Sequence, residues 1–329
     1  MSNLPILLVT LEADPASRHV IEAEVAGAAQ VVYLADLPAA ARAGALASAA
    51  VLLSRNTAKE LAAAEPTLLA GARLVQFVTA GVDYVPLADF PPGLAVAANG
   101  GAYAEPMAEH ALAMTLAALK RLPVEHEKLA RREFDQFRSN RMLAGSVVGI
   151  LGFGGIGIAT ARLMRALGAR VHAVNRSGRT DEPVDWIGTE KQLPALLAAS
   201  DVLLLSLPLT PATNGLIGAA ELVAMKPDAV LVNLARGEIV DEAALFAHLQ
   251  AHPGFTACID AWWVEPVRHG RFEMGHDFTS LPNVIASPHN SASVKDWRHV
   301  ALRRAVGNAR RALVGERPAN LVPPADRMQ

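Results

Sequence analysis

The sequence has a single cysteine, no block of basic residues and no long uninterrupted apolar stretch. One cysteine, Cys258, cannot form an internal disulfide, and its place in an apolar run predicts a buried structural thiol. The missing basic block argues against nucleic acid as a partner, because phosphate binding needs clustered Lys and Arg side chains. No stretch reaches the roughly 18 apolar residues of a membrane span, so we expect no membrane partner.

The first ten residues lack the basic region and the apolar core of a signal peptide, and we therefore expect a cytoplasmic protein. The chain has 329 residues, of which 52% are hydrophobic and 19% charged, with a formal net charge of −2. These values are typical of a globular protein and not of a disordered one. The length is sufficient for about two domains, each with its own core.

A strand, a glycine-rich turn and a helix are predicted in succession around residue 150. The apolar run Val147–Leu151 is typical of a buried strand, and residues 158–167 carry helix formers up to Gly168. The glycines between them have the spacing of a dinucleotide-binding loop, in which they allow a tight turn, the approach of a pyrophosphate and close helix packing. The helix N-terminus also attracts phosphate. We therefore predict cofactor contacts at Gly152, Gly154, Gly155, Ile156 and Gly157. The alternative is a glycine turn that serves packing alone.

Apolar runs alternate with helical stretches along the chain, which indicates parallel sheets with crossover helices. Strands are expected at 5–9, 31–34, 51–54, 74–78 and 94–97, and then at 147–151, 170–174, 202–206, 229–233, 255–259 and 284–286. Helices are expected at 15–27, 59–70, 108–122, 195–199, 242–248 and 293–314. The predicted fold class is α/β, with two Rossmann-like doubly wound parallel-sheet domains.

The choice between nicotinamide dinucleotides is expected to depend on Asn175, about 20 residues beyond the glycines. An acidic residue there would bond the ribose 2′-OH of NAD and would repel a 2′-phosphate. Here a neutral amide is followed by Arg176 and Ser177, which suit a phosphate. We therefore predict that NADP(H) is preferred and that NAD(H) is possible. The alternative is that Arg176 and Arg179 are ordinary surface charges.

Three residues that follow predicted strands could act together in the reduction of a 2-oxo acid. Arg236 offers a guanidinium for a carboxylate, His289 an imidazole as proton donor, and Glu265 a carboxylate that keeps the imidazole charged. Because parallel strands end at one edge of a sheet, these side chains are expected on the same edge. Taken singly, each is more often a surface or capping residue than a catalytic one.

Together these motifs resemble the D-isomer-specific 2-hydroxyacid dehydrogenase family over nearly the whole chain. The matching segments are 152–157, 206–213, 225–227, 233–237, Asp260 together with Glu265-Pro266, and 288–289. The resemblance implies that Arg236, Glu265 and His289 are the catalytic set. It also implies that backbone N–H groups of Thr79, Ala80 and Gly81 receive the substrate carboxylate. Further cofactor contacts are implied for Asn175, Arg176, Ser177, Leu207, Pro208, Thr213, Leu234, Ala235 and Asp260, of which Asp260 would meet the nicotinamide carboxamide.

The resemblance implies a domain division as well. A substrate domain of residues 1–100 and 290–329 would be interrupted by a dinucleotide-binding domain of residues 101–289. A homodimer built on the cofactor domain is also implied, and the polar segment 124–141 beside an apolar helix favours it. The sequence departs from the family at Asn290-Ser291, where a glycine is usual two residues after the histidine. His269 and His276 lack a ligand constellation, so we expect no metal site.

These predictions favour an oxidoreductase, an NADPH-preferring glyoxylate/hydroxypyruvate reductase that converts small 2-oxo acids to D-2-hydroxy acids. One alternative is the same fold acting on another acid, such as phosphite, formate or a bulkier 2-oxo acid. A second alternative is a non-catalytic dinucleotide-sensing binding protein, which the complete Arg, Glu and His set argues against.

Overall fold

The computed structural model describes residues 4–328, which fold into two compact units. The first unit comprises the described residues up to Tyr103 together with those from Val294 onward, and the second comprises Ala104–Ser293. The second unit is therefore an insertion in the sequence of the first. The second boundary lies a few residues later than the predicted 290, because Asn290 and Ser291 still donate their N–H groups to Asp260.

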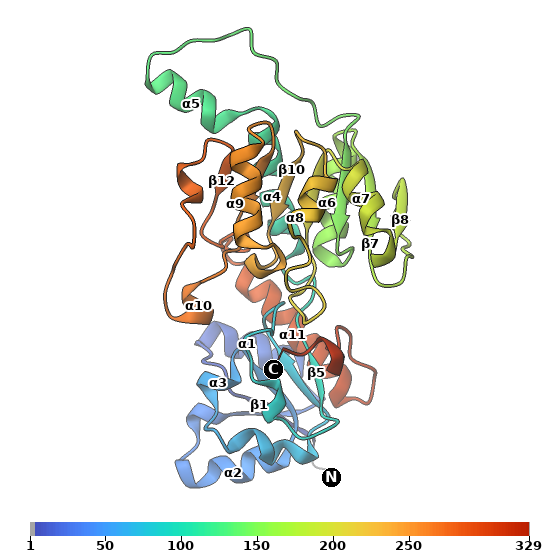
Figure 1. The fold of residues 1–329 in the computed structure, drawn as a ribbon. Helices are drawn as coiled ribbons and strands as arrows, with labels where there is room; N and C mark the ends of the chain where they lie inside the picture. The colour runs from blue at the N-terminus through green and yellow to red at the C-terminus, as the bar shows by residue number, and fades with distance from the viewer. Residues whose placement is uncertain (1–3, 329) are drawn as a thin grey trace. The chain divides into compact units, whose positions relative to one another are not determined.

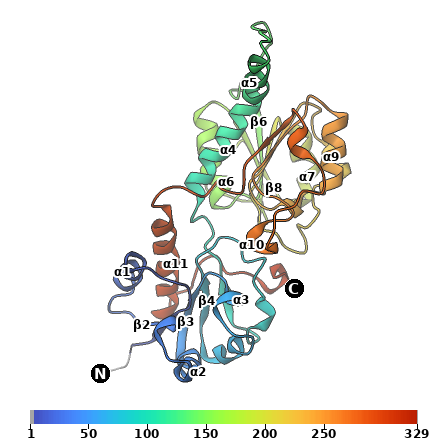
Figure 2. The same ribbon diagram turned by 90° about the vertical axis from the view of Figure 1, so that its left-hand side faces the viewer.

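The first unit contains a five-stranded parallel sheet in the order β2-β1-β3-β4-β5. Most of this unit is drawn in blue and cyan in Figure 1. Its strands are β1 (Ile6–Val9), β2 (Gln30–Tyr33), β3 (Ala49–Ser54), β4 (Leu74–Phe77) and β5 (Ala95–Ala97). Its helices are α1 (Pro15–Glu24), α2 (Ala39–Ser48), α3 (Thr57–Glu60) and α11 (Trp297–Leu313). The C-terminal helix α11 lies beside α1 and packs against β3 and β4 (Figure 2).

The buried face of α11 explains why the C-terminal segment completes this unit. Ala301, Ala305 and Ala309 recur every four residues and are almost fully buried, so the helix backbone can approach the sheet closely. Leu302 and Val306 fill the space between them and join a core of residues from β1, β3 and α1. The helix therefore shields one face of the sheet from solvent.

The second unit contains a seven-stranded parallel sheet in the order β12-β11-β10-β9-β6-β7-β8. Its strands are β6 (Val147–Leu151), β7 (Arg170–Val174), β8 (Trp186–Gly188), β9 (Val202–Leu205), β10 (Val230–Asn233), β11 (Thr256–Ile259) and β12 (Val284–Ala286). Its helices are α4 (Ala104–Leu119), α5 (Leu122–Ala130), α6 (Gly155–Ala166), α7 (Leu193–Ala199), α8 (Ala219–Ala224), α9 (Glu242–Ala251) and α10 (Pro266–His269). The predicted fold class is confirmed, since both sheets are parallel with crossover helices.

Several predicted element boundaries were wrong, and prolines explain two of them. The expected helix at 59–70 is the short α3 followed by a 3-10 helix, Glu65–Gly71, with Pro66 in its first turn. The expected helix at 108–122 is α4, which ends at Leu119, and Pro123 lies in the first turn of α5. Proline has no N–H to donate, so it disrupts a helix interior but fits a first turn. The last helix begins at Trp297 and not at 293.

Cys258 lies in β11 and is completely buried, as predicted for a structural thiol. Burial raises the pKa of this thiol to about 12, so the thiol stays protonated near neutral pH. Among the helices of residues 4–328, none combines the length and apolar character needed to cross a membrane.

Candidate active site

The carboxyl ends of the strands in the second unit form the edge that holds most of the predicted site residues. Gly152 follows β6, Asn175 follows β7, Asp260 follows β11 and Ser287 follows β12. The chain runs from β6 out to β8 and then returns to β9 on the other side of β6. The sheet therefore has its topological switch point between β6 and β9, where open α/β sheets bind ligands.

Two glycines of the turn after β6 are required by packing at this switch point. Gly152 has a φ of 96°, and a Cβ there would lie 2.7 Å from the backbone nitrogen of Leu207. A Cβ on Gly157 would lie 2.5 Å from the carbonyl oxygen of Gly152. The hydroxyl of Ser206 donates to that same oxygen at 2.6 Å, so the turn is fixed to the loop after β9.

Gly154 differs from these two glycines, because no atom lies within 4 Å of where its Cβ would be. It is exposed and is the N-cap residue of the 12-residue helix α6. The first N–H groups of a helix have no intrahelical partner, and they carry a partial positive charge. Open space in front of that helix end fits the pyrophosphate of a dinucleotide, so the residues present suit the implied cofactor.

The side chain of Asn175 organises the loop after β7. Its Oδ1 accepts the N–H of Gly178 at 2.7 Å, and its Nδ2 donates to the carbonyl oxygen of Arg179 at 2.9 Å. The hydroxyl of Ser177 also donates to Asn175 Oδ1, at 3.2 Å. Arg176 and Arg179 are exposed on this loop, so Asn175 positions a segment that carries two guanidinium groups. The sequence alone did not indicate this role.

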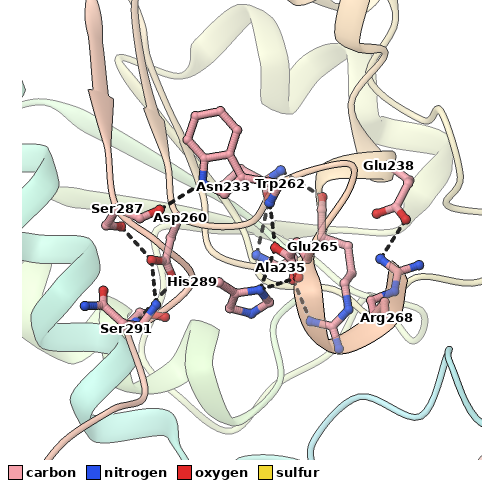
Figure 3. Close-up of polar contacts among 12 residues, drawn as sticks. Asn233, Ala235, Glu238, Asp260, Trp262, Glu265, Arg268, Ser287, His289 and Ser291 are labelled. Carbon is pink, nitrogen blue, oxygen red and sulfur yellow. Dashed lines mark hydrogen bonds and ion pairs between the residues drawn. The ribbon is translucent and has the colours of Figure 1, made fainter. Parts of the chain in front are cut away.

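Glu265 and His289 form a close pair (Figure 3). His289 Nδ1 lies 2.7 Å from Glu265 Oε1 and 2.8 Å from Oε2, and the N–H of Trp262 donates to Oε1 at 2.7 Å. Burial raises the pKa of the Glu265 carboxyl. The hydrogen bond and charge of His289, the Trp262 N–H and the charge of Arg236 together outweigh burial and hold that pKa below its usual range. Glu265 is therefore a carboxylate near neutral pH.

The backbone of His289 is held in an uncommon conformation. Its φ is 50°, in the left-handed region that a non-glycine residue seldom adopts, which costs on the order of 1–3 kcal/mol. Its N–H donates to the carbonyl oxygen of Asp260 at 2.9 Å. The Nδ1 atom faces Glu265, which leaves Nε2 as the nitrogen that can meet a reacting atom.

Arg236 belongs to a turn that the side chain of Asn233 holds at the end of β10. Asn233 Nδ2 donates to the carbonyl oxygen of Arg236 at 2.8 Å, and Asn233 Oδ1 accepts the N–H of Ala235 at 3.0 Å. The Arg236 guanidinium donates to the carbonyl oxygen of Ala235 at 2.8 Å and acts electrostatically on Glu265. The structure thus brings Arg236, Glu265 and His289 together from loops after three neighbouring strands, β10, β11 and β12.

Two further contacts join the Arg236 turn to the Glu265 segment. A Cβ on Gly237 would collide with the peptide between Trp262 and Trp263, so this glycine allows the two segments to touch. Arg268 Nη1 lies 2.6 Å from Glu238 Oε1, in a pair that is partly buried (Figure 3). Glu238 and Arg268 were not predicted as site residues. In the sequence, only their closeness to Arg236 and Glu265 distinguishes them.

Asp260 is fully buried and organises the segment around His289. Its Oδ1 accepts the hydroxyl of Ser287 at 2.5 Å and the N–H of Asn290 at 3.1 Å, and its Oδ2 accepts the N–H of Ser291 at 3.3 Å. His110 on α4 contributes a ring nitrogen 3.1 Å from the Ser287 hydroxyl. From the sequence, a structural role was favoured for His110, and Ser287 could have been found from its place two residues before His289.

The other residues that are implied as cofactor contacts lie on the same edge of the second sheet. Most of their side chains are buried or form hydrogen bonds within the protein. The Thr213 hydroxyl donates to the carbonyl oxygen of Pro208 at 2.8 Å, and Leu234 and Ala235 are buried. Leu207 follows β9, where its backbone faces Gly152. A cofactor would therefore meet this group chiefly through backbone atoms.

Thr79, Ala80 and Gly81 belong to the first unit, where they follow β4 and are partly exposed. The carbonyl oxygen of Thr79 accepts the N–H of Asn99 at 2.8 Å, and the Thr79 hydroxyl accepts the phenol of Tyr84 at 3.4 Å. These contacts fix the turn and leave its N–H groups at the carboxyl edge of the first sheet.

The two histidines considered as metal ligands are engaged elsewhere. His269 Nδ1 accepts the N–H of Glu265 at 3.0 Å, and the ring of His276 stacks on Phe246. Within residues 4–328, no group of three or more His, Cys, Asp or Glu side chains is arranged to hold a metal ion.

Comparison with known proteins gives this arrangement a context. Residues 112–291 match the family model described as the D-isomer specific 2-hydroxyacid dehydrogenase, NAD binding domain. The chain is 33% identical over 239 residues to glyoxylate reductase of Aeropyrum pernix, across 70% of each protein. It is 37% identical over 180 residues to glycerate dehydrogenase of Methylorubrum extorquens, and this match covers 55% of the chain and about half, 54%, of that relative.

Solved structures match the whole chain. A protein from Pyrobaculum aerophilum, provisionally named a formate dehydrogenase, is 31% identical with a TM-score of 0.78, and the match covers 98% of this chain and 99% of that one. A D-isomer specific 2-hydroxyacid dehydrogenase from Xanthobacter autotrophicus Py2, solved with NADPH and MES, is 25% identical with a TM-score of 0.78 and 98% coverage of both chains.

Two glycines of the turn, Gly157 and Gly154, predict different results for the same substitution. Gly157→Ala should lower the free energy of unfolding by about 1–3 kcal/mol, because its Cβ would meet the Gly152 carbonyl. Gly154→Ala should leave the melting temperature unchanged but weaken dinucleotide binding at least about tenfold, since the methyl group would occupy the space in front of α6. Differential scanning fluorimetry and calorimetric titration would test both, and normal dinucleotide affinity in Gly154→Ala would contradict the assignment.

Proposed function

The chain belongs to the D-isomer specific 2-hydroxyacid dehydrogenase family, and from that premise we propose that it reduces small 2-oxo acids with NADPH as the preferred hydride donor. The observation that carries this proposal is the His289–Glu265 pair beside Arg236, at the carboxyl edge of a dinucleotide-binding sheet. The names of relatives, glyoxylate reductase and hydroxypyruvate reductase among them, support glyoxylate or hydroxypyruvate as substrate.

The proposed reaction needs one hydride and one proton. When bound, the reduced nicotinamide supplies a hydride to the carbonyl carbon of the 2-oxo acid. The electron pair of the carbonyl π bond moves to the oxygen, and His289 donates the proton from Nε2 to that oxygen. The products are a 2-hydroxy acid and the oxidised dinucleotide, and His289 is left neutral until it takes up a proton from solvent.

Glu265 and Arg236 would stabilise charged groups during the proposed reaction. Glu265 is a carboxylate at neutral pH, and through Nδ1 it favours the protonated imidazole and fixes the ring orientation. The guanidinium of Arg236 is suited to bind the substrate carboxylate and to stabilise negative charge that develops on the carbonyl oxygen. The backbone N–H groups of Thr79, Ala80 and Gly81 are proposed to receive the same carboxylate.

The preference for NADPH is supported by the loop after β7. Asn175 carries no charge, and its hydrogen bonds hold a loop on which Arg176 and Arg179 are exposed. A guanidinium pairs strongly with phosphate, and no acidic side chain occupies the position of the usual ribose ligand. A relative of the same family binds NADPH in its solved structure.

Formate oxidation is the alternative that a similar structure favours by its name. That reaction transfers a hydride from formate and leaves carbon dioxide, so it needs no proton donor to a carbonyl oxygen. A buried carboxylate paired with a histidine at 2.7 Å would then have no acid–base work to do. We therefore favour 2-oxo acid reduction, and an assay of formate with NADP and NAD separates the two.

A homodimer is supported by the segment from α5 to β6. Phe134 and Phe137 are 78% and 86% exposed, and Leu122, Leu129 and Met142 are more than half exposed on the same segment. Among the described residues, no side chain of α5 is buried, and α5 with the loop after it projects from the rest of the second unit (Figure 1). Several large apolar side chains exposed on one segment indicate an interaction surface, which we assign to a second copy of this chain.

Cofactor preference gives the first test. We expect kcat/KM to be higher with NADPH than with NADH by about tenfold or more, since a charge-assisted contact is worth roughly 1.5–3 kcal/mol. Asn175→Asp combined with Arg176→Ala should shift the preference toward NADH. Arg304→Gln, an exposed arginine of the first unit, serves as control. Equal efficiency of the wild type with both cofactors would contradict the proposal.

The acid–base pair gives a pH test. Reduction needs a protonated His289, so its kcat/KM should hold at low pH and fall as pH rises, while oxidation shows the opposite dependence. Glu265→Gln removes the carboxylate that holds the ring through Nδ1, so reduction should be slower with some activity retained. His289→Ala should lose roughly 10²–10⁴-fold. Near-normal reduction by His289→Ala across the pH range would show that another group is the donor.

The molar mass of the protein in solution tests the proposed dimer. Light scattering should give about twice the 34.7 kDa of one chain for the wild type. Phe134→Ser with Phe137→Ser should shift the mass toward one chain, because the substitutions remove the exposed aromatic surface. Val223→Ser, at an exposed valine on α8, is the matched control and should leave the mass unchanged. A wild-type mass of one chain at all concentrations would refute the assignment.

A further inference from the structure

His110 connects helix α4 to the ends of two strands of the second unit, β11 and β12. Its Nε2 atom lies 3.1 Å from the hydroxyl oxygen of Ser287, which follows β12, and 3.9 Å from Oδ1 of Asp260, which follows β11. The helix itself packs against β10 and β11, where the thiol of Cys258 donates to the carbonyl oxygen of Met114 at 3.6 Å. The imidazole is therefore held at the carboxyl edge of the sheet by a helix that packs against that sheet.

The contacts of Ser287 determine which ring nitrogen of His110 carries a proton. The Ser287 hydroxyl has one proton, and its oxygen lies 2.5 Å from Asp260 Oδ1 (Figure 3). A carboxylate only accepts hydrogen bonds, so the hydroxyl proton lies on that contact. The Ser287 oxygen can then only accept from His110, and Nε2 therefore carries a proton whether the ring is neutral or charged. His110 and Ser287 thus form a chain of two donors that ends on Asp260.

This chain of donors stabilises a charge that has no access to solvent. Asp260 is fully buried, and a buried carboxylate is unfavourable unless it is paired and hydrogen-bonded. Within residues 4–328, His110 is the one basic side chain that pairs with Asp260, at 3.9 Å. The hydrogen bond from His110 also polarises the Ser287 hydroxyl, which strengthens the hydrogen bond that Asp260 accepts. Loss of His110 would therefore weaken the contact that orients the Asp260 carboxylate.

The cluster around Asp260 retains hydrogen-bonding capacity that the protein does not use. A carboxylate has about four acceptor positions, and three of them take the Ser287 hydroxyl and the N–H groups of Asn290 and Ser291. Ser291 is only 2% exposed, and its hydroxyl has no hydrogen-bond partner among the described residues. One acceptor position and one hydroxyl suit a primary amide, which has two N–H donors and a carbonyl oxygen. The nicotinamide carboxamide, which is the implied contact of Asp260, is such a group.

We propose that His110 is a positioning residue for the cofactor, which acts through Ser287 to hold the Asp260 carboxylate toward the nicotinamide carboxamide. This inference rests on the proposed function and deepens it. The phosphates of the dinucleotide are assigned to α6, which follows β6, and to the loop after β7, whereas β9 and β10 lie between β6 and β11 in the sheet. The effect of His110 should therefore be confined to the nicotinamide end of the cofactor.

The test compares the binding of two ligands by calorimetric titration. These are NADP⁺ and 2′-phospho-ADP-ribose, which has the same phosphates but lacks the nicotinamide ring. His110→Phe keeps an aromatic ring and removes the N–H, so it should weaken NADP⁺ binding by about tenfold or more, because a hydrogen bond to a charged group is lost. Binding of 2′-phospho-ADP-ribose should be nearly unchanged. His110→Gln restores an N–H donor and should bind NADP⁺ almost as the wild type does.

Ser287→Ala interrupts the same chain at its second donor and should show the same selective loss of NADP⁺ binding. It therefore decides the question if His110→Phe does not fold. Adding His110→Phe to Ser287→Ala should cause no further loss, because His110 acts through the hydroxyl that is already removed. Glu109→Gln, at the exposed neighbouring residue on α4, is the control and should bind both ligands as the wild type does.

A purely structural role of His110 would lower the affinities for both ligands together or would make the Phe and Gln variants equal, and either result overturns the inference. Unaltered NADP⁺ affinity in His110→Phe or in Ser287→Ala also overturns it, while 2-oxo acid reduction stands. If the wild type binds NADP⁺ but reduces no 2-oxo acid, the proposed function is wrong, and the two titrations still decide about His110. A wild type that binds neither ligand would refute both.

Discussion

Parallel pairing of the seven strands in the second unit is the constraint on which the candidate site depends. Parallel strands all end at one edge, so loops that are far apart in the sequence become neighbours there. Arg236, Glu265 and His289 follow β10, β11 and β12 in this way, and none of them needs a long side-chain reach. The same rule places Arg55 beside Thr79 in the first unit. In each unit the loops at the strand ends are therefore neighbours, and each crossover helix fixes which ends are adjacent.

Most strands could be predicted because they are short unbroken apolar runs, as expected when both faces of a parallel sheet are covered. β8 was missed because its three residues, Trp186–Gly188, lie at the sheet edge and carry no such run. Helix boundaries near Pro66 and Pro123 were wrong for a different reason. A proline is compatible both with the end of one helix and with the first turn of the next, and only the tertiary contacts decide between these.

The site could be predicted as a set of residue types but not as a set of contacts. Gly152, Gly154 and Gly157 are the same residue in one motif, yet two are packed against other atoms and one faces open space. That difference depends on the loop after β9, which lies 54 residues from the glycine turn in the sequence. No local sequence pattern therefore predicts it. Asn175 was predicted to contact the cofactor, and the sequence did not indicate that its side chain also shapes the loop that carries the arginines.

The sequence departs from the family pattern at Asn290-Ser291, after His289. The contacts of two acidic side chains, Asp260 and Glu265, explain why this departure is tolerated. Asp260 takes the N–H groups of Asn290 and Ser291, which are backbone donors, so the identity of those side chains matters little to it. Glu265 takes one backbone N–H, from Trp262, and keeps both oxygens within reach of the imidazole. The positive φ of His289 turns the chain so that its backbone faces one acid and its ring the other. A histidine fixed at both points keeps one orientation, in which Nε2 is the ring nitrogen that does not face Glu265.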